Sequence, residues 1–410
     1  MAGLVTGDSI VTPDAKLTGA GVNSLINRVT EVDPRGKKVL LSSGKELAYD
    51  KLVLGMGSSP VMPPIPGNDL DGVFILRSLR HAEAMRQFLS DRKPRKLVLI
   101  GAGFVSLEIA ILLKQADPEC EITIIELLGY PLPTILDHEL GNRVSKFLEN
   151  KGLELRMGAR LVEILGRDGA VSGVRLDSGD VIDAEMLFMN VGAKPNVDLA
   201  RDAGLEMSQY GIKVNQFLET SDPDIMAAGD CADTMHFVTG RPNPGALRGP
   251  AVIMGRLVAK RLAGYEIPFP GILNACACGL IDLNIAATGL NEQQAKDEGF
   301  EPVSATVDSR SKHGMIPGMK PWILKLVFDK NSRKLIGGQI VSDDIPPVKE
   351  IDAVSALILG GKTVEDITVF MAAGNPDCSP EPSMEPIAIA GEWRCLKAAA
   401  LGEGEFDESV

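Results

Sequence analysis

A glycine-rich turn between an apolar strand and an apolar helix constrains this chain more than any other feature. The predicted strand is KLVLI (96–100), and the turn GAGFVS (101–106) leads into the helical run LEIAILLKQ. Gly101 permits a tight turn, Gly103 leaves room for a pyrophosphate at the backbone, and the first helical amides favour its charge. Ser106 is small enough for close helix–strand packing. The pattern predicts a dinucleotide site formed by Gly101, Gly103, Phe104, Val105 and Ser106; a turn without a ligand is the alternative.

A carboxylate follows at the distance that such a site requires. The buried run EITIIE (121–126) closes a β–α–β unit and ends at Glu126, about 20 residues after the turn. Glu126 would accept hydrogen bonds from an adenosine ribose and repel a 2′-phosphate, and no Arg follows closely, so NADH is favoured over NADPH. Glu108 lies in the apolar helix, where an unpaired carboxylate is costly to bury. We expect a contact near the nicotinamide or an ion pair with a Lys, or else a solvated helix face.

Five ordered blocks resemble the pyridine nucleotide–disulfide oxidoreductase superfamily. The branch most similar contains NADH oxidases, coenzyme A-disulfide reductases and NADH:rubredoxin or ferredoxin-type reductases. The resemblance runs from about residue 12 to about residue 395. The blocks are YDKLVLGMGS (49–58), GAGFVSLE (101–108), NVGAKPN (190–196), AAGDCA (227–232), and a C-terminal region with TGL (288–290) and LIGG (335–338).

The resemblance implies an α/β fold with two Rossmann-like domains, one for FAD and one for NADH, and a C-terminal α+β dimerisation domain that makes a homodimer. It implies that the 101–106 turn binds the NADH pyrophosphate and Glu126 the ribose, with Glu108 and Gly192 near the nicotinamide. On the flavin side it places Gly57 and Ser58 by the adenine half of FAD, and Gly229 and Asp230 by its ribityl or pyrophosphate region. A turn Asp with no ligand is the alternative for Asp230.

The expected domains follow from these blocks and from changes in composition. Residues 1–75 and 201–266 would form the two parts of the FAD domain, 76–200 the NADH domain, 267–400 the C-terminal domain and 401–410 a frayed tail. The Pro-rich segment 58–68 is expected to be a connecting loop that extends no sheet. Helical spacing predicts helices over 80–91, 138–151 and 246–264.

The FAD domain is expected to be incomplete at its N-terminus. The family begins with its own strand, GxGxxG loop, helix and ribose-binding acid, and this sequence joins the pattern after them, so the family's redox-active Cys would also be absent. The chain is a fragment or has a wrongly assigned start, or the unit lies on another polypeptide, or this is a subunit that no longer holds FAD tightly. The first is favoured because the Gly57 and Asp230 turns still match flavin contacts. Weak flavin absorbance and poor thermal stability are then expected of purified 1–410.

Composition argues against two classes of binding partner and indicates a cellular compartment. A net charge of −13 argues against nucleic acid or an anionic membrane as partner. Six scattered cysteines predict a reduced, cytoplasmic protein. Residues 1–10 lack the basic start and apolar core of a signal peptide, and the most apolar stretch, 97–113, is too interrupted to span a membrane.

The remaining reactive residues form no recognisable site. Cys276 and Cys278 could chelate a soft metal or form a redox pair, but no second pair or His follows, so packing is favoured and no metal is expected. The four histidines form no triad, and none follows His313 to serve as a base in the tail. A locally basic stretch could dock an acidic carrier or be ordinary solvated surface: Arg310, Lys312, Lys320 and Lys325.

The predicted function is that of an NADH-dependent flavoprotein oxidoreductase. Hydride would pass from NADH to FAD, and electrons onward to a ferredoxin- or rubredoxin-like carrier, a partner redox enzyme or O₂. The hydride step requires no side-chain acid or base, so no catalytic residue is assigned. Two alternatives stay open: an NAD(H)-binding, non-catalytic subunit of a larger redox complex, and a disulfide reductase whose Cys lies on missing N-terminal sequence.

Overall fold

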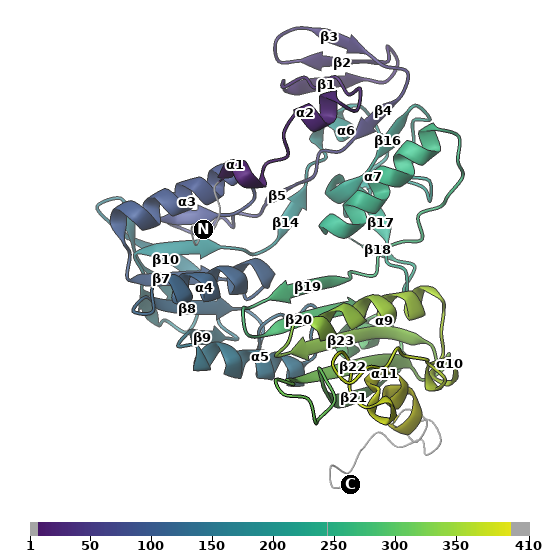
Figure 1. The fold of residues 1–410 in the computed structure, drawn as a ribbon. Coiled ribbons are helices and arrows are strands. Elements are labelled where there is room, and N and C mark those ends of the chain that lie inside the picture. The colour runs from purple at the N-terminus through teal and green to yellow at the C-terminus, as the bar shows by residue number, and fades with distance from the viewer. Residues whose placement is uncertain (1–6, 244, 395–410) are drawn as a thin grey trace.

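The glycine-rich turn follows the central strand of a five-stranded parallel sheet (Figure 1). The computed structural model describes residues 7–243 and 245–394. The strand order is β6 (Val73–Ile75), β13 (Met186–Met189), β7 (Lys96–Ile100), β8 (Glu121–Glu126) and β9 (Glu154–Met157). The runs 96–100 and 121–126 are therefore neighbouring strands, as the sequence predicts.

Both faces of this sheet are buried, which explains why its strands are continuously apolar rather than alternating. Leu97 and Leu99 pack toward α3 (Leu79–Arg92), α4 (Phe104–Ala116) and α5 (His138–Asn150). Val98 and Ile100 point the other way, toward an antiparallel sheet of β10 (Leu161–Arg167), β11 (Ala170–Leu176) and β12 (Val181–Asp183). The turn after β7 is thus held between two packed layers.

The C-terminal region forms an antiparallel sheet whose two faces pack on different partners. Its order is β19 (Cys276–Gly279), β20 (Asn284–Gly289), β23 (Leu335–Ser342), β22 (Pro321–Asp329) and β21 (Pro302–Arg310). One face packs on α9 (Glu350–Leu359), α10 (Val364–Thr368) and α11 (Pro386–Ile389). The other contributes Ile285 and Val341 to the same hydrophobic cluster as α4 and α5. The two sheets therefore share one core, and Figure 1 shows them adjacent.

The part expected to bind flavin contains little sheet. Among the described residues, β4 (Leu52–Leu54) pairs in parallel with β16 (Ile225–Ala227) alone. The hairpin strands β1 (Val29–Asp33), β2 (Lys38–Leu41) and β3 (Glu46–Ala48) form a separate sheet, and α7 (Arg248–Leu262) packs beside β16. The shorter elements are α1 (Gly7–Ile10), α2 (Ala15–Thr18), α6 (Asp198–Asp202), β15 (Ile212–Lys213), η1 (Gly229–Cys231), β17 (Ala232–Met235), β18 (Pro242–Asn243), α8 (Glu292–Asp297), η2 (Pro346–Lys349), η3 (Pro382–Met384) and η4 (Ala390–Arg394).

Two strands connect this region to the parallel sheet. The expectation that residues 58–68 extend no sheet is wrong for the first three, because β5 (Ser58–Pro60) pairs with β14 (Ala193–Pro195). Each strand ends in a proline, and proline is tolerated at such an isolated two-stranded edge. The predicted 401–410 tail lies outside the described residues. Within residues 7–243 and 245–394, every helix is too short or too polar to cross a bilayer.

Candidate functional site

The turn after β7 exposes backbone amides at the start of α4. Gly101 has a φ of +89°, and a Cβ there would lie 2.3 Å from the carbonyl oxygen of Asn190, so only glycine fits. Gly103 caps α4 with no side-chain hydrogen bond to the first amides. A Cβ on Gly103 would meet nothing closer than the Asn190 Nδ2, at 3.7 Å. The amides are therefore open to an anionic ligand.

A cavity of about 610 Å³ lies over this turn. Of the residues predicted to bind NADH, six line it, whereas Ser106 and Glu108 do not. Its lining includes Gly101, Gly103, Phe104, Val105, Glu126, Leu132, Pro133, Thr134, Arg160 and Gly192. The volume suits a cofactor-sized ligand.

Ser106 and Asn190 hold the turn from behind. Ser106 is fully buried, and its Oγ accepts a hydrogen bond from Asn190 Nδ2 at 3.3 Å. Ser106 thus packs the helix against the end of β13, as its size predicts, rather than touching the cavity. Asn190 opens the block 190–196 in the sequence, but the sequence alone assigns it no role in holding the turn.

Glu126 lies at the cavity edge with its carboxylate fixed. Its oxygens accept the Ala102 N–H at 2.7 Å and the Leu128 N–H at 2.9 Å. Each oxygen keeps a further lone pair for a ribose hydroxyl. The Ala159 N–H donates to the Glu126 carbonyl oxygen, and this brings exposed Arg160 to the same cavity. The sequence hides this arginine because it follows β9, a strand later than Glu126.

Glu108 has a partner that the sequence does not indicate. It is half-buried on α4 and lies close enough to Cys278 of β19 for its carboxylate to act on the thiol's pKa. Burial first, and then the Glu108 charge, raise the pKa of the Cys278 thiol well above its ordinary value. The expected Lys partner is absent from the ion pairs of the described residues. The two residues instead lie where α4 meets the C-terminal sheet.

The predicted flavin contacts meet where β4 and β16 end. Ser58 Oγ donates to Asp230 Oδ2 at 2.7 Å, and Arg77 Nη2 donates to the same oxygen at 2.8 Å. Gly57 and Gly229 have φ values of +63° and +76°. A Cβ at Gly55 would meet no atom within 4 Å. An open backbone beside a carboxylate and a guanidinium fits a ligand carrying hydroxyls and phosphates, as FAD does; Arg77 gave no sequence signal.

The β5–β14 ladder joins these two places. Ser58 opposes Pro195, and Pro60 opposes Ala193, while the Val61 N–H donates to the Gly192 carbonyl at 3.0 Å. Gly192 lines the cavity over the 101–106 turn, and Ser58 contacts Asp230. A short strand ladder therefore connects Gly192 at the cavity to the Ser58–Asp230 turn.

The buried and half-buried cysteines among the described residues lack the features of reactive thiols. Burial raises the pKa of Cys120 and of Cys276 to about 11, and burial also raises that of Cys231. Cys378 is exposed in the C-terminal segment. Raised pKa values keep a thiol protonated and unreactive, which agrees with a packing role for Cys276 and Cys278.

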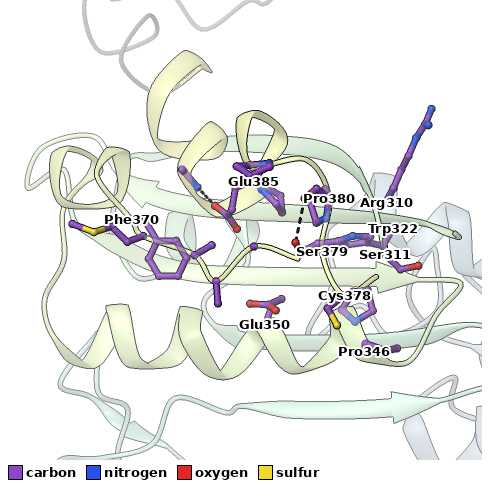
Figure 2. Close-up of a pocket in the computed structure, with 18 residues that line it drawn as sticks. Arg310, Ser311, Trp322, Pro346, Glu350, Phe370, Cys378, Ser379, Pro380 and Glu385 are labelled. Carbon is purple, nitrogen blue, oxygen red and sulfur yellow. Dashed lines mark hydrogen bonds between the residues drawn. The ribbon is translucent and has the colours of Figure 1, made fainter. Parts of the chain in front are cut away.

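A second cavity, of about 570 Å³, lies between β22, α9 and the segment before α11 (Figure 2). Trp322 lines it and is 3% exposed, and its Nε1 has no hydrogen-bond partner among the described residues. Burial raises the pKa of Glu350 and of Glu385 at its rim. This cavity is remote from the glycine-rich turn.

One predicted surface residue is in the interior. Lys325 is 2% exposed, so the proposed basic patch of Arg310, Lys312, Lys320 and Lys325 is wrong in that member. Successive side chains of β22 point to opposite faces of the sheet. Leu324 and Leu326 face α9, whereas Lys325 faces Asp137 and Glu139 of the parallel-sheet domain. The number of charges along the sequence does not reveal which face is covered.

Known proteins match the chain across both halves. Residues 7–246 match the pyridine nucleotide-disulphide oxidoreductase family, and residues 276–383 match the dimerisation domain of the same family. An NADH oxidase of Methanocaldococcus jannaschii is 32% identical over 374 residues, 90% of this chain and 80% of that protein. An NAD(P)H coenzyme A polysulfide/persulfide reductase of Pyrococcus horikoshii is 31% identical over 383 residues, 92% of this chain and 84% of that protein.

A solved structure agrees with this match. An NAD-dependent persulfide reductase from A. fulgidus superposes with a TM-score of 0.90 at 30% identity, covering 95% of this chain and 73% of its own. The glycine-rich turn and the flavin-side turn thus lie in a fold that binds FAD and NAD(P)H. The chain belongs to the pyridine nucleotide-disulphide oxidoreductases, FAD-dependent enzymes that oxidise NADH.

Proposed function

We propose that this chain binds NADH in the cavity over the 101–106 turn, with its nicotinamide at the Gly192 end, and delivers its electrons to an acceptor other than a disulfide of this chain. The observation that carries the proposal is the β5–β14 ladder, which joins the Gly192 end of the cavity to the Ser58–Asp230 turn. Bound FAD would supply the two-electron chemistry, taking hydride from NADH and passing electrons onward.

The chain's own residues would bind and orient the cofactors. The α4 amides and Gly103 would hold the NADH pyrophosphate, and Glu126 would accept from the adenosine ribose. On the flavin side, Ser58, Arg77 and Asp230 would hold hydroxyl and phosphate groups. Glu108 lies one turn along α4 from the cavity lining and would face the nicotinamide end of the site.

The buried thiols of this chain bear on which electron acceptor we propose. The described buried cysteines have raised pKa values, and burial and a hydrogen bond to the Leu54 carbonyl occupy Cys231, the one beside Asp230. O₂ or an electron-carrier protein is therefore the acceptor we propose. Persulfide or disulfide reduction is the second candidate, favoured by the printed activities of the Pyrococcus and A. fulgidus proteins. A non-catalytic NAD(H)-binding subunit would bind NADH without oxidising it.

We further propose that the chain is a cytoplasmic homodimer. Its domain boundaries are proposed at 75/76, 200/201 and 266/267. The dimerisation-domain match supports self-association. Exposed large apolar side chains in the C-terminal region support it too, because Met371, which lines the second cavity, is 93% exposed, and Ile345 and Val369, next to lining residues, are each 68% exposed.

Substitution of Gly103 tests the NADH site. Gly103 has a φ of −81°, so Gly103→Val introduces no backbone strain, yet its side chain would occupy the space left for the pyrophosphate. We expect the holoenzyme variant to lose NADH binding by calorimetry while unfolding at the parent temperature. Gly255→Val, on the open side of α7, is the matched control and should bind NADH normally. Unchanged affinity in Gly103→Val would show that the site is assigned wrongly.

Steady-state kinetics distinguish the acceptors. NADH oxidation by the holoenzyme would be compared with O₂, a ferredoxin, coenzyme A disulfide and a persulfide. Faster turnover with O₂ or ferredoxin is expected. Preference for the sulfur compounds would favour the second candidate, and NADH binding without turnover would favour the non-catalytic subunit.

A further inference from the structure

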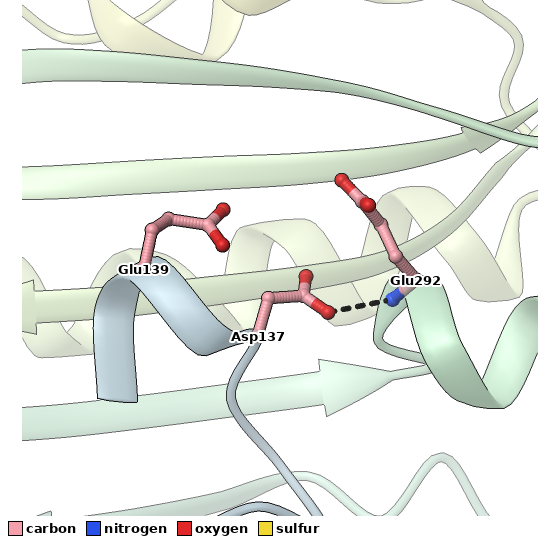
Figure 3. A group of neighbouring side chains, drawn as sticks. All are labelled: Asp137, Glu139 and Glu292. Atoms are coloured by element: carbon pink, nitrogen blue, oxygen red, sulfur yellow. Dashed lines mark hydrogen bonds between the residues drawn. The ribbon is translucent and has the colours of Figure 1, made fainter. Parts of the chain in front are cut away.

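Lys325 is a buried cation at the boundary between the parallel-sheet domain and the C-terminal sheet. Its Nζ lies 2.9 Å from Asp137 Oδ2 and 2.8 Å from Glu292 Oε1, and it also contacts Glu139. Figure 3 shows Asp137 and Glu139 at the start of α5 facing Glu292 at the start of α8. These three carboxylates could geometrically surround a metal ion, but the Lys325 ammonium already supplies the cation.

The charges explain why the lysine stays ionised although it is buried. Burial alone would lower the pKa of Lys325, but the Asp137 charge and the hydrogen bonds with Glu139 and Glu292 outweigh it and raise that pKa above its ordinary value. An ammonium in this position is costly to bury unless paired, and removing it leaves uncompensated carboxylates. The cluster therefore holds its members firmly in place.

Asp137 forms hydrogen bonds through its backbone as well as through its side chain. The Asp137 N–H donates to Gln339 Oε1 at 2.7 Å, and Gln339 Nε2 donates to Asp137 Oδ2 at 2.6 Å. The Glu292 N–H donates to Asp137 Oδ1 at 3.0 Å. Gln339 is 1% exposed and directly opposes Lys325 in the β22–β23 ladder. One patch of the C-terminal sheet therefore fixes the residue that begins α5.

The segment just before Asp137, residues 132–136, forms a wall of the NADH cavity. Leu132, Pro133 and Thr134 line that cavity, and the Leu132 N–H donates to the Ala102 carbonyl at 3.0 Å. From its other side, Asn291 Nδ2 donates to the Pro133 carbonyl at 3.3 Å, and Gln294 Nε2 donates to the Thr134 carbonyl at 2.9 Å. The wall is thus held between the glycine-rich turn and the C-terminal domain.

We propose that Lys325 is a positioning residue for NADH: by anchoring Asp137 to the C-terminal sheet, it sets the cavity wall at 132–136 and so the affinity for NADH. The proposal rests on the NADH site assigned above. It makes a residue of the dimerisation region part of the support of a cofactor site that it does not touch.

The test compares two ways of loosening the wall. Lys325→Met removes the buried cation, and Gln294→Ala removes the exposed hydrogen bond to Thr134 together with the Asn291 N–H bond that completes the capping box of α8. We expect the Kd and KM for NADH of the holoenzyme to rise about tenfold in Lys325→Met and by less in Gln294→Ala, with kcat at saturating NADH unchanged in both. Thermal unfolding, measured alongside, separates loss of affinity from loss of folded protein.

Lys151→Met is the matched control. Lys151 also forms an ion pair across the two domains, 2.5 Å from Asp282, but it does not touch the cavity wall, so its NADH affinity should equal that of the parent. If Lys325→Met and Gln294→Ala both bind NADH as tightly as the parent, the proposal is overturned. If Gly103→Val also binds NADH normally, the site assignment itself has failed, so the two failures are distinguishable.

Discussion

Glu126 combines a structural and a binding role in one side chain. Its carboxylate ties the Ala102 amide of the turn to the Leu128 amide beyond β8, and its free lone pairs face the cavity. Sequence spacing predicts the second role, because the acid ends the strand that follows the turn. The first role, and the arrival of Arg160 beside it, depend on hydrogen bonds between segments that no spacing rule relates.

Cofactor choice should follow from this pair of side chains. In Glu126→Ser the ribose loses a charged acceptor. The carboxylate that would repel a 2′-phosphate is also gone, whereas Arg160, which would attract that phosphate, remains. The ratio of kcat/KM for NADPH to that for NADH is expected to rise about tenfold, since a charged hydrogen bond is worth about 1.5–3 kcal/mol. Glu121→Ser, at the exposed start of the same strand, should leave the ratio alone. An unchanged ratio in Glu126→Ser would remove Glu126 from the ribose site.

At the scale of elements, apolar patterning predicts those that pack and misses those fixed by their neighbours. The runs 96–100 and 121–126 are strands and 138–150 is a helix because their apolar side chains fill a two-faced core. The β5–β14 ladder was missed because three residues ending in proline carry no pattern of their own. Lys325 was misplaced because burial of a lysine depends on three carboxylates far away in the sequence.

The two glycines of the turn should differ in what they tolerate. Gly101→Ala would place its Cβ 2.3 Å from the Asn190 oxygen in a left-handed conformation, so about 3 kcal/mol of unfolding free energy should be lost. Gly103→Ala has ordinary backbone angles and open space, and should unfold like the parent. Denaturant unfolding measures both. Equal stability of the two variants would contradict the geometry of the turn.

For the whole molecule, the region expected to bind flavin has the smallest sheet around its site among the described residues. Within residues 7–243 and 245–394, β4 pairs with β16 alone, and a two-stranded sheet is marginal by itself. Val53, Val252 and Ile253 are 41%, 46% and 47% exposed in this half. The family match predicts the flavin turns of Gly57 and Asp230 from the sequence, but only the structure reveals how much apolar surface surrounds them.

Flavin content should reflect this weakness. Polypeptide 1–410 is expected to purify with flavin well below one per chain and to gain thermal stability when FAD is added, because a ligand that binds only the folded state shifts unfolding by mass action. Flavin absorbance and thermal scans with and without FAD measure this. A chain that purifies fully yellow would contradict it.

The single hydrophobic cluster beneath α4, α5, β20 and β23 has a consequence for how the molecule comes apart. Side chains such as Ile124 and Val341 belong to one core, although they lie on different sheets. Neither sheet can lose its packing without exposing the other, so the two should melt as one cooperative unit. Hydrogen exchange should then protect the amides of β7 and β23 to a common free energy, while those of β4 and β16 open earlier. Packing against the C-terminal sheet should therefore contribute directly to the stability of the parallel-sheet domain.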